Sequence, residues 1–234
     1  MRGRWGRASL PDVTTASLDA LLAERYSCRE FADTPVDPAT VDEILELAGR
    51  TPSWCNTQPW HVHVSDPATT DRWRAELAEH LGAGMMAGSD LPFPSRYAGV
   101  FDERRKAAAW QLYEAVGIEF GDRAASLQQT MRNFDFFGAP HVAIITTEAD
   151  LGPYGAVDCG LFVQSFLLAA RSRGIDAVPQ AALAMQAGFF REQLGLPEHR
   201  QVVVGISFGH ALPEAAANDY RTPRQPLADL RTWV

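Results

Sequence analysis

The chain has 234 residues, a formal net charge of −8 and a composition of 46% hydrophobic and 21% charged residues, which is ordinary for a globular protein. The acidic balance argues against a nucleic-acid partner bound through a general basic surface. No apolar run approaches the roughly 20 residues that a membrane helix needs, so we expect no membrane contact.

Three cysteines, Cys28, Cys55 and Cys159, are widely spaced and odd in number. They form neither a C-x-x-C pair nor a disulfide framework, which favours a reducing, cytoplasmic location. Residues 1–13 contain arginines with no apolar stretch behind them. We therefore expect an N-terminal arm there, either mobile or in contact with a partner, rather than a secretory signal.

The first half of the chain shows apolar residues at helical spacing, interrupted by one short alternating stretch. The best-defined helix opens at Asp37, which suits the N-cap, with Pro38 in the first helical position, and it ends at Gly49. The elements expected in this half are helices over 14–25, 37–49 and 69–81 and a strand over 61–64.

The middle of the chain is less regular. Glycine and proline residues break 82–101 into loop, and the stretch 134–140 is too interrupted to form a helix. Between these two stretches, helices are expected over 102–116 and 123–133. Residues 141–147 are β-rich and largely apolar, which predicts a central strand of a sheet.

The longest helix is expected over 154–173. Its apolar residues, among them Val157, Leu161 and Phe166, leave little polar face, so we expect this helix to be buried at the centre of the fold. The elements expected after it are a short β segment at 176–178, a helix over 187–194, a strand over 201–208 and, from residue 211 onward, an extended arm.

Strands and helices mix along the whole length, without an internal repeat or a low-complexity linker. This arrangement favours a single α+β domain over residues 14–210, in which helices surround a sheet. The arms expected at 1–13 and 211–234 have little of their own to pack against. Arms of this kind are often stabilised by a second subunit, so we expect a homodimer in which the C-terminal arm packs on the partner.

Arginines gather near both ends of this acidic chain. Arg25, Ser27 and Arg29 offer two guanidinium groups and a hydroxyl, and Arg221 and Arg224 offer two more guanidinium groups near the C-terminus. Guanidinium groups bind phosphate through paired, charge-assisted hydrogen bonds. If the fold brings the two pairs together, they form a pocket for a phosphate dianion.

A polar loop follows the helix at 37–49 and contains Pro52, Ser53, Asn56 and Gln58. Its prolines exclude a regular helix, so backbone and side-chain polar groups are free to face a ligand. The arginine cluster at 25–29 and this polar loop at 52–60 lie at the two ends of one region. Together they suggest a loop-built site for a ligand that is phosphorylated, planar and rich in hydrogen-bonding edges.

Other familiar sites are absent or incomplete. The sequence has no dinucleotide-binding fingerprint after a strand and no P-loop. His61 and His63 fall on one face of the predicted strand, a spacing that can hold a metal, but no nearby cysteine or carboxylate completes the set. We therefore expect no metal site.

Several segments, taken in order, resemble the FMN-dependent nitroreductase family. They are Arg-x-Ser-x-Arg-x-Phe at 25–31, Pro-Ser-x-x-Asn-x-Gln-Pro-Trp at 52–60, Asp-x-Gly at 158–160, and a strand at 202–209 followed by Asn-x-x-Arg-x-x-Arg-x-Pro at 218–226. Each motif is weak alone, and the ordered set carries the resemblance. It implies a nitroreductase-like α+β fold, with a central, mixed but mainly antiparallel sheet surrounded by helices, and an intertwined homodimer with FMN at the subunit interface.

The resemblance also implies how FMN is held. Arg25 and Ser27 would bind its phosphate, together with Arg221 and Arg224. Arg29 would lie near the N1/O2 edge of the isoalloxazine ring, where a positive charge supports the reduced cofactor.

Other residues would surround the ring. Pro52, Ser53 and Asn56 would reach the flavin across the dimer interface, and Asn133 would meet its pyrimidine edge. A further segment would lie along the ring and offer a backbone N–H to N5, and which N–H does so is open; its residues are Pro179, Gln180, Ala181 and Ala182.

The activity that the resemblance implies is ping-pong hydride transfer. NADPH or NADH would reduce FMN and leave, and a small nitroaromatic or quinone acceptor would then bind; no catalytic side chain is required, because the cofactor carries the chemistry. Three alternatives stay open. They are another flavin reaction of the family (reductive dehalogenation, flavin reduction or dehydrogenation of a small metabolite), a non-enzymatic FMN-binding protein, and a purely structural dimer.

Overall fold

The computed structural model of the protein describes residues 17–84 and 88–234. The N-terminal arm expected at 1–13 and the start of the first expected helix, at 14–16, lie outside these ranges. The helices are α1 (Leu18–Glu24), α2 (Pro38–Ala48), α3 (Pro67–Gly82), α4 (Val100–Ala115), α5 (Arg123–Met131), α6 (Gly152–Ser172), α7 (Ala181–Ala184), α8 (Ala187–Leu194) and α9 (Leu227–Leu230). The short 3₁₀ helices are η1 (Trp54–Asn56), η2 (Phe136–Gly138), η3 (Ala149–Leu151) and η4 (Ala216–Asn218).

The strands form an antiparallel sheet in the order β1-β2-β4-β3. Their bounds are β1 (His61–Val64), β2 (His141–Glu148), β3 (Asp176–Gln180) and β4 (Arg200–Gly209). Strand β2 has a hydrogen-bonded neighbour on each side, which confirms the central position predicted from its apolar run. An isolated parallel bridge between Ser27 and Ala177 adds to the antiparallel ladder at β3.

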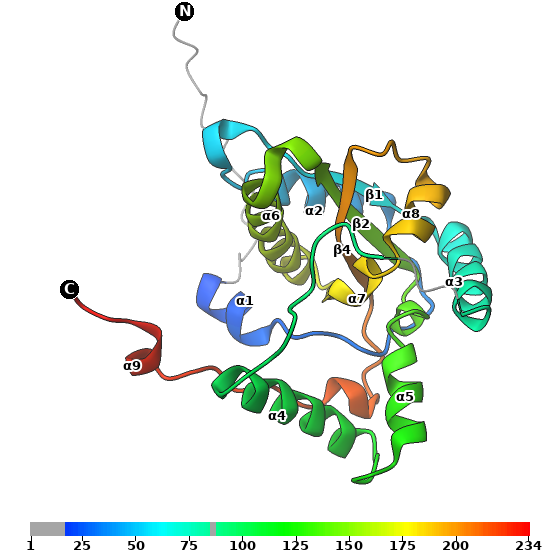
Figure 1. Ribbon diagram of the computed structural model, residues 1–234, viewed down its shortest axis with the longest axis vertical. Helices are drawn as coiled ribbons and strands as arrows, with labels where there is room; N and C mark the ends of the chain where they lie inside the picture. The colour runs from blue at the N-terminus through cyan, green and yellow to red at the C-terminus, as the bar shows by residue number, and fades with distance from the viewer. Residues whose placement is uncertain (1–16, 85–87) are drawn as a thin grey trace, which may run out of the picture.

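Helices cover both faces of the sheet (Figure 1). Ala143 and Ile145 of β2 belong to one apolar cluster with α2 and α6, whereas Val142 and Ile144 belong to a second cluster with α3 and α8. Successive side chains of a strand point to opposite faces, so this alternation assigns each cluster to its own face. All four side chains are fully buried, and the sheet is the middle of three layers.

Local signals start α2 and α3 where the sequence predicts. The carboxylate of Asp37 accepts a hydrogen bond from the Ala39 N–H at 2.9 Å, and the carboxylate of Asp66 accepts one from the Thr69 N–H at 2.7 Å. A proline follows each aspartate in the first helical position, where a missing N–H costs nothing.

Helix α6 has two different faces, and the expectation of a uniformly buried helix is wrong in this respect. Phe166 is fully buried, but Tyr154, Val157 and Leu161 are 61%, 56% and 46% exposed. By length and composition alone, the helical stretch 149–172 is apolar enough to cross a membrane, although half of its most apolar window is buried inside the protein. Its packing against α2 and the sheet is that of a core helix whose second apolar face is open to solvent.

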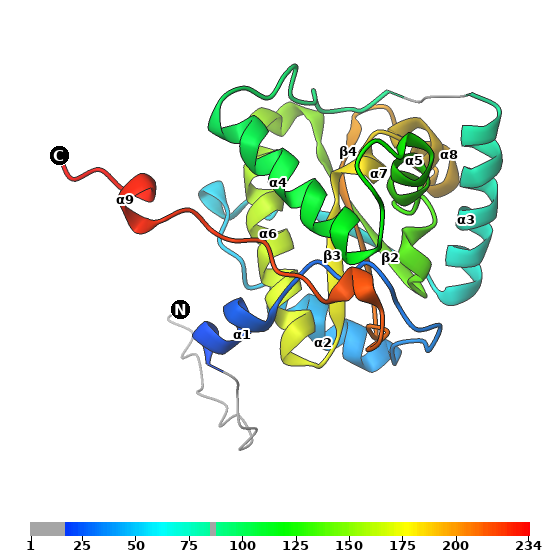
Figure 2. The same cartoon turned by 90° about the horizontal axis from the view of Figure 1, so that it is seen from below.

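The segment that follows α1 lies beside the segment that follows β4 (Figure 2). Ala32 donates its N–H to the carbonyl of His210 at 2.8 Å. The buried side chain of Asn218 accepts a hydrogen bond from the Arg29 N–H at 2.8 Å and donates one to the carbonyl of Glu30 at 2.9 Å. These bonds join residues near the two ends of the described chain.

Helices α4 and α5 form an insert between α3 and β2, and neither contributes a fully buried residue. Helix α4 contacts η4, so the insert lies against the junction of the two distant segments (Figures 1 and 2). The C-terminal segment passes α1, where Arg224 shares a cavity with Leu22, and then runs away from the body; the short helix α9 interrupts an arm that the sequence predicts to be extended.

Candidate functional site

A cavity of about 280 Å³ lies between the end of α1 and the C-terminal segment. Its lining includes all five residues of the two predicted arginine clusters: Arg25, Ser27, Arg29, Arg221 and Arg224. The hydrogen bonds that join the segments after α1 and after β4 explain why residues so far apart in the sequence meet here.

The positive charge of this cavity is not neutralised by any carboxylate in the part of the chain that the structure describes. None of its four arginines forms an ion pair there; instead, Arg29 donates to the carbonyl of Ser27 at 3.1 Å and Arg221 to the carbonyl of Asn218 at 2.6 Å. Burial, and next the positive charge of Arg224, lower the pKa of Arg25. An anion bound between these groups would relieve their repulsion.

Two tyrosines that the sequence analysis missed orient the arginines. The guanidinium carbon of Arg221 lies 3.9 Å from the centre of the Tyr26 ring, and that of Arg29 lies 5.7 Å from the centre of the Tyr220 ring. The ordinary tyrosine pKa of about 10 keeps both rings neutral near pH 7, and burial raises the pKa of both phenols further. The only signal in the sequence is position, since each tyrosine directly adjoins a cavity arginine in the chain.

A second cavity, of about 210 Å³, is also lined by Arg29. Asn133 and Pro179, both implied by the resemblance, line it together with Arg29. Helices α4 and α5 of the insert supply much of the remaining wall, with Ala109, Leu112, Tyr113, Gln129 and Thr130. Phe137 and Val178 complete it. This wall combines apolar surfaces with a few polar groups, as sites for flat organic ligands do.

The two cavities together fit the two ends of FMN. The first offers unneutralised guanidinium groups, which suit a phosphate dianion. The second offers apolar side chains for a planar ring and an amide, from Asn133, for its polar edge. Arg29 lines both cavities and lies between the two ends.

Gln180 is implied as a flavin contact, but its side chain faces the core. It is 3% exposed, the hydroxyl of Ser207 donates to its Oε1, and its Nε2 donates to the carbonyl of Asn133 at 2.8 Å. Only the backbone of Gln180 is therefore left for a ligand, and its side chain holds Asn133. Ala181 and Ala182 begin α7, and neither lines either cavity.

Ser207 also belongs to a Gly-x-Ser-x-Gly pattern at 205–209, which in one class of hydrolases marks an exposed nucleophile at a strand-to-helix turn. Here Ser207 lies inside β4, is fully buried, and has Gln180 as its hydrogen-bond partner. This geometry excludes it as a nucleophile.

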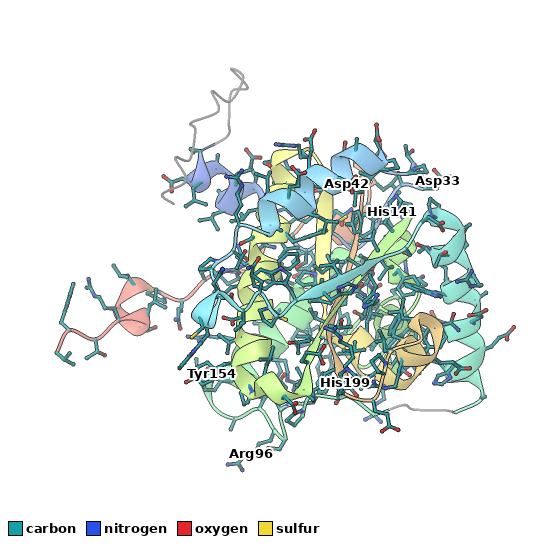
Figure 3. All side chains as sticks on the ribbon, turned by 90° about the horizontal axis from the view of Figure 1, so that it is seen from above. Asp33, Asp42, Arg96, His141, Tyr154 and His199 are labelled. Atoms are coloured by element: carbon teal, nitrogen blue, oxygen red, sulfur yellow. The ribbon has the colours of Figure 1, made fainter. Side chains whose placement is uncertain are left out.

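Pro52, Ser53 and Asn56 line neither cavity of their own chain. Their loop runs along the open face of α6 instead, where the N–H of Trp54 donates to the carboxylate of Asp158 at 3.1 Å. The Trp54 ring lies 4.9 Å from the ring of Tyr154, which extends outward near the start of α6 (Figure 3). Within one chain, the structure does not bring these predicted residues to the arginines.

The model of the nitroreductase family matches residues 22–210 of the chain. Nitroreductase NfnB of Mycolicibacterium smegmatis is 37% identical over 227 residues, which cover 94% of this chain and 96% of that protein. The 4-nitrobenzoate reductase of Pseudomonas putida is 34% identical over 216 residues, which cover 91% of this chain and 93% of that protein.

The similarity extends from the sequence to the fold, as the solved structure of a nitroreductase shows. The crystal structure of the FMN-dependent nitroreductase NfnB from Mycobacterium smegmatis in complex with NADPH matches with a TM-score of 0.87 and 34% identity, over 92% of this chain and 97% of that chain. The extent of the family match and the identity to these relatives over most of their length lead to one conclusion: the chain belongs to the nitroreductase family.

Proposed function

We propose that this protein is an FMN-dependent oxidoreductase that uses NADPH, or NADH, to reduce nitroaromatic compounds. The observation that carries the proposal is the meeting of Arg25, Arg29, Arg221 and Arg224 around one cavity, without a described carboxylate between them. Such a cavity requires an anion, and its neighbour, lined by the insert, suits a flat ring.

The relatives support the choice of reaction. NfnB is named as an FMN-dependent nitroreductase and was crystallised with NADPH, and the relative from Pseudomonas putida is named for 4-nitrobenzoate. These names favour nitro reduction over reductive dehalogenation, flavin reduction or a purely structural role.

Each part of the site has a task in this reaction. Bound FMN supplies hydride-transfer chemistry. Arg25, Arg221 and Arg224 anchor its phosphate, and Arg29 places a positive charge between the phosphate and ring ends of the site. Asn133, held by Gln180, faces the polar edge of the ring, while Tyr113 and the rest of the insert enclose the space left for donor and acceptor.

The proposal includes a homodimer with the flavin at the subunit interface. Ser53 and Asn56 line neither cavity of their own chain and belong to a loop beside the exposed apolar face of α6. In a dimer formed through this face, the loop of one subunit reaches the flavin of the other. The C-terminal arm, with Leu227, Leu230 and Trp233 exposed, packs on the same partner.

The free thiols support a cytoplasmic location for the protein. Cys28, Cys55 and Cys159 form no disulfide with one another, which suits a reducing compartment.

The phosphate site is tested by the double substitution Arg25→Ala/Arg221→Ala. A charged hydrogen bond is worth about 1.5–3 kcal/mol, so losing two arginines weakens FMN binding by at least about a hundredfold. The purified wild-type protein is yellow and oxidises NADPH when 4-nitrobenzoate is added, whereas the double variant is colourless and inactive. Fluorescence titration of the apoproteins with FMN measures the difference.

The matched control is Arg72→Ala/Arg173→Ala, which removes the same amount of charge. Both arginines are exposed; Arg72 lies in α3 and Arg173 directly follows α6. This control should bind FMN as the wild type does. A double variant Arg25→Ala/Arg221→Ala that is purified with a full complement of FMN contradicts the phosphate site, and a wild-type protein that binds FMN but oxidises no NADPH contradicts the enzyme.

A further inference from the structure

The loop over residues 53–58 has a backbone that its own sequence does not favour. Cys55, Asn56 and Gln58 have φ values of 50°, 56° and 48°, in the left-handed region that glycine prefers. Asparagine tolerates this region, but cysteine and glutamine rarely enter it. Strain of this kind persists only where the surroundings hold the backbone in place, and it gathers at functional sites.

The surroundings that hold this loop lie on one stripe of α6. Tyr154, Asp158 and Ser165 are separated by four and seven residues, so they lie on the same side of the helix. Thr51 donates its hydroxyl to that of Ser165 at 2.6 Å, and the N–H of Trp54 donates to the Asp158 carboxylate at 3.1 Å. The loop therefore runs along α6 in the opposite direction and is fixed to it before the strained residues begin.

Asp158 is the charged member of this set. It is only 6% exposed, although it lies beside apolar side chains that are open to solvent in a single chain. Burying a carboxylate is costly unless hydrogen bonds compensate it, and its described partner is the backbone of the loop. A hydrogen bond within the loop adds to this support. The hydroxyl of Ser53 accepts it from the Gln58 N–H at 2.9 Å, which joins the two ends of the loop.

We propose that Asp158 is a positioning residue, whose carboxylate holds the 53–58 loop in the shape with which Ser53 and Asn56 reach the flavin of the partner subunit. The proposal rests on the proposed function. It explains two observations about this strained loop. No residue of the loop lines either cavity of its own chain, and the loop is nevertheless fixed to α6 beside that helix's exposed apolar face.

The first test is the affinity of Asp158→Ala for FMN, measured by fluorescence titration of the apoprotein. We expect the dissociation constant to rise at least tenfold, while sedimentation shows the dimer retained and the thermal unfolding midpoint stays close to that of the wild type. The control Asp150→Ala removes an exposed carboxylate near the start of α6 and leaves the affinity unchanged. An Asp158→Ala protein with wild-type FMN affinity, kcat and KM contradicts the proposal.

A milder variant keeps the test decisive where the alanine protein fails to fold or to form a dimer. Asp158→Asn keeps the shape and one acceptor oxygen but exchanges a charged acceptor for a neutral one. We expect its FMN affinity to fall about threefold. Unchanged affinity in this variant then contradicts the proposal in the same way.

The second test asks which subunit the loop serves. Mixed dimers are prepared from one Asp158→Ala subunit and one Arg25→Ala/Arg221→Ala subunit, each with its own purification tag. If the loop acts across the interface, one site combines intact arginines with an intact loop, and the mixed dimer binds one FMN with wild-type affinity and regains about half the wild-type activity. If the loop serves its own chain, both sites carry a defect and no affinity is regained, which contradicts the proposal.

These outcomes separate the two proposals. A wild-type protein that binds no FMN contradicts the proposed function before any variant is made. A wild-type protein that binds FMN and reduces 4-nitrobenzoate, with an Asp158→Ala variant that does the same, contradicts only the role of Asp158.

Discussion

The arginines of the first cavity are oriented by rings and carbonyls instead of carboxylates. Tyr26 stacks on Arg221 and Tyr220 on Arg29; both phenols are neutral near pH 7, since the ordinary tyrosine pKa is about 10, and burial raises the pKa of each further. A neutral ring fixes the direction of a guanidinium group without cancelling its charge. The charge is therefore kept for the ligand, at the cost of repulsion between Arg25 and Arg224 when the cavity is empty.

Gln180 provides a prediction at the same scale. Replacing it by leucine leaves the Ser207 hydroxyl and the Asn133 carbonyl without their partner, and each buried polar group that loses its bond costs about 1–3 kcal/mol. We expect Gln180→Leu to unfold at a lower urea concentration and to bind FMN more weakly, because Asn133 is no longer held at the second cavity. Urea titration and FMN titration measure the two effects.

The matched control is Gln128→Leu, the same exchange at an exposed position of α5. It should change neither the urea midpoint nor the FMN affinity. If Gln180→Leu unfolds earlier but binds FMN with wild-type affinity, the side chain supports the core alone and does not position Asn133.

The sequence indicates the arginines of this site but not how they are held. Arg25, Arg29, Arg221 and Arg224 are noticeable as clustered positive charges on turn-forming sequence in an acidic chain. That the two pairs meet could be inferred only from the family resemblance, since spacing along a chain does not reveal contacts across it. The inward side chain of Gln180 had no local signal at all, because its partner Asn133 belongs to a different element.

At the scale of elements, the edge strand β1 carries a half-buried histidine, His63. Burial, then the charges of His61 and Arg200, lower the pKa of His63 to about 4. The unfolded chain has a histidine pKa of about 6.5, so between these values it binds a proton that the folded protein does not. The free energy of unfolding therefore falls as the pH drops from 6.5 towards 4.

This linkage predicts how His63→Gln behaves. The variant lacks the group that takes up a proton on unfolding, so its stability should fall less than that of the wild type between pH 7.5 and pH 5. Urea midpoints of both proteins at the two pH values give the difference. His210→Gln, at an exposed histidine after β4, should lose stability as the wild type does. Equal losses for His63→Gln and the wild type would show that His63 protonates freely in the fold.

Elements with strong local signals were predicted closely. Helix α2 has both its N-cap and its final glycine in the sequence, and α8 matches the expected range 187–194. The residues of η2 were expected to be irregular, and Phe136 and Phe137 there adopt positive φ values. The short helix α7 was missed, because its position depends on tertiary contact: a side chain at Gly205 would collide with Leu183 of α7.

Helix α6 shows where composition stops being informative. An apolar helix is expected to be buried, but apolarity does not state whether its cover comes from the same chain or from another. Phe166 faces the core of its own chain, whereas Val157 and Leu161 remain exposed in it. The helix thus combines a core face with an apolar face that is open to solvent in the single chain.

At the scale of the whole molecule, the C-terminal arm leaves the body beyond the cavity residue Arg224 (Figures 1 and 2). Leu227, Leu230 and Trp233 are 60%, 66% and 80% exposed on it. Burying a large apolar side chain is worth about 1.5–3 kcal/mol, so a partner that covers even one of them gains a tenfold or larger advantage in affinity.

We therefore predict that deletion of residues 226–234 weakens the dimer at least tenfold. Arg221 and Arg224 are retained in this variant, so the phosphate cavity keeps its arginines. Sedimentation equilibrium measures the dissociation constant of the dimer with and without FMN. Replacing Leu227, Leu230 and Trp233 by serine in the full-length arm should have the same effect, and a truncated protein that associates as tightly as the wild type would show that the arm does not contact the partner.

The crossing of the two distant segments also constrains when the protein can acquire its cofactor. Phe31 bridges Ala211, and the guanidinium groups that line the first cavity come from both segments. A nascent chain still attached to the ribosome before Arg221 and Arg224 have emerged lacks two of the four arginines that line the cavity. If these arginines bind the FMN phosphate as proposed, the cofactor is bound only after nearly the entire polypeptide has been translated, and truncated products that end before Arg221 bind FMN more weakly than the finished protein.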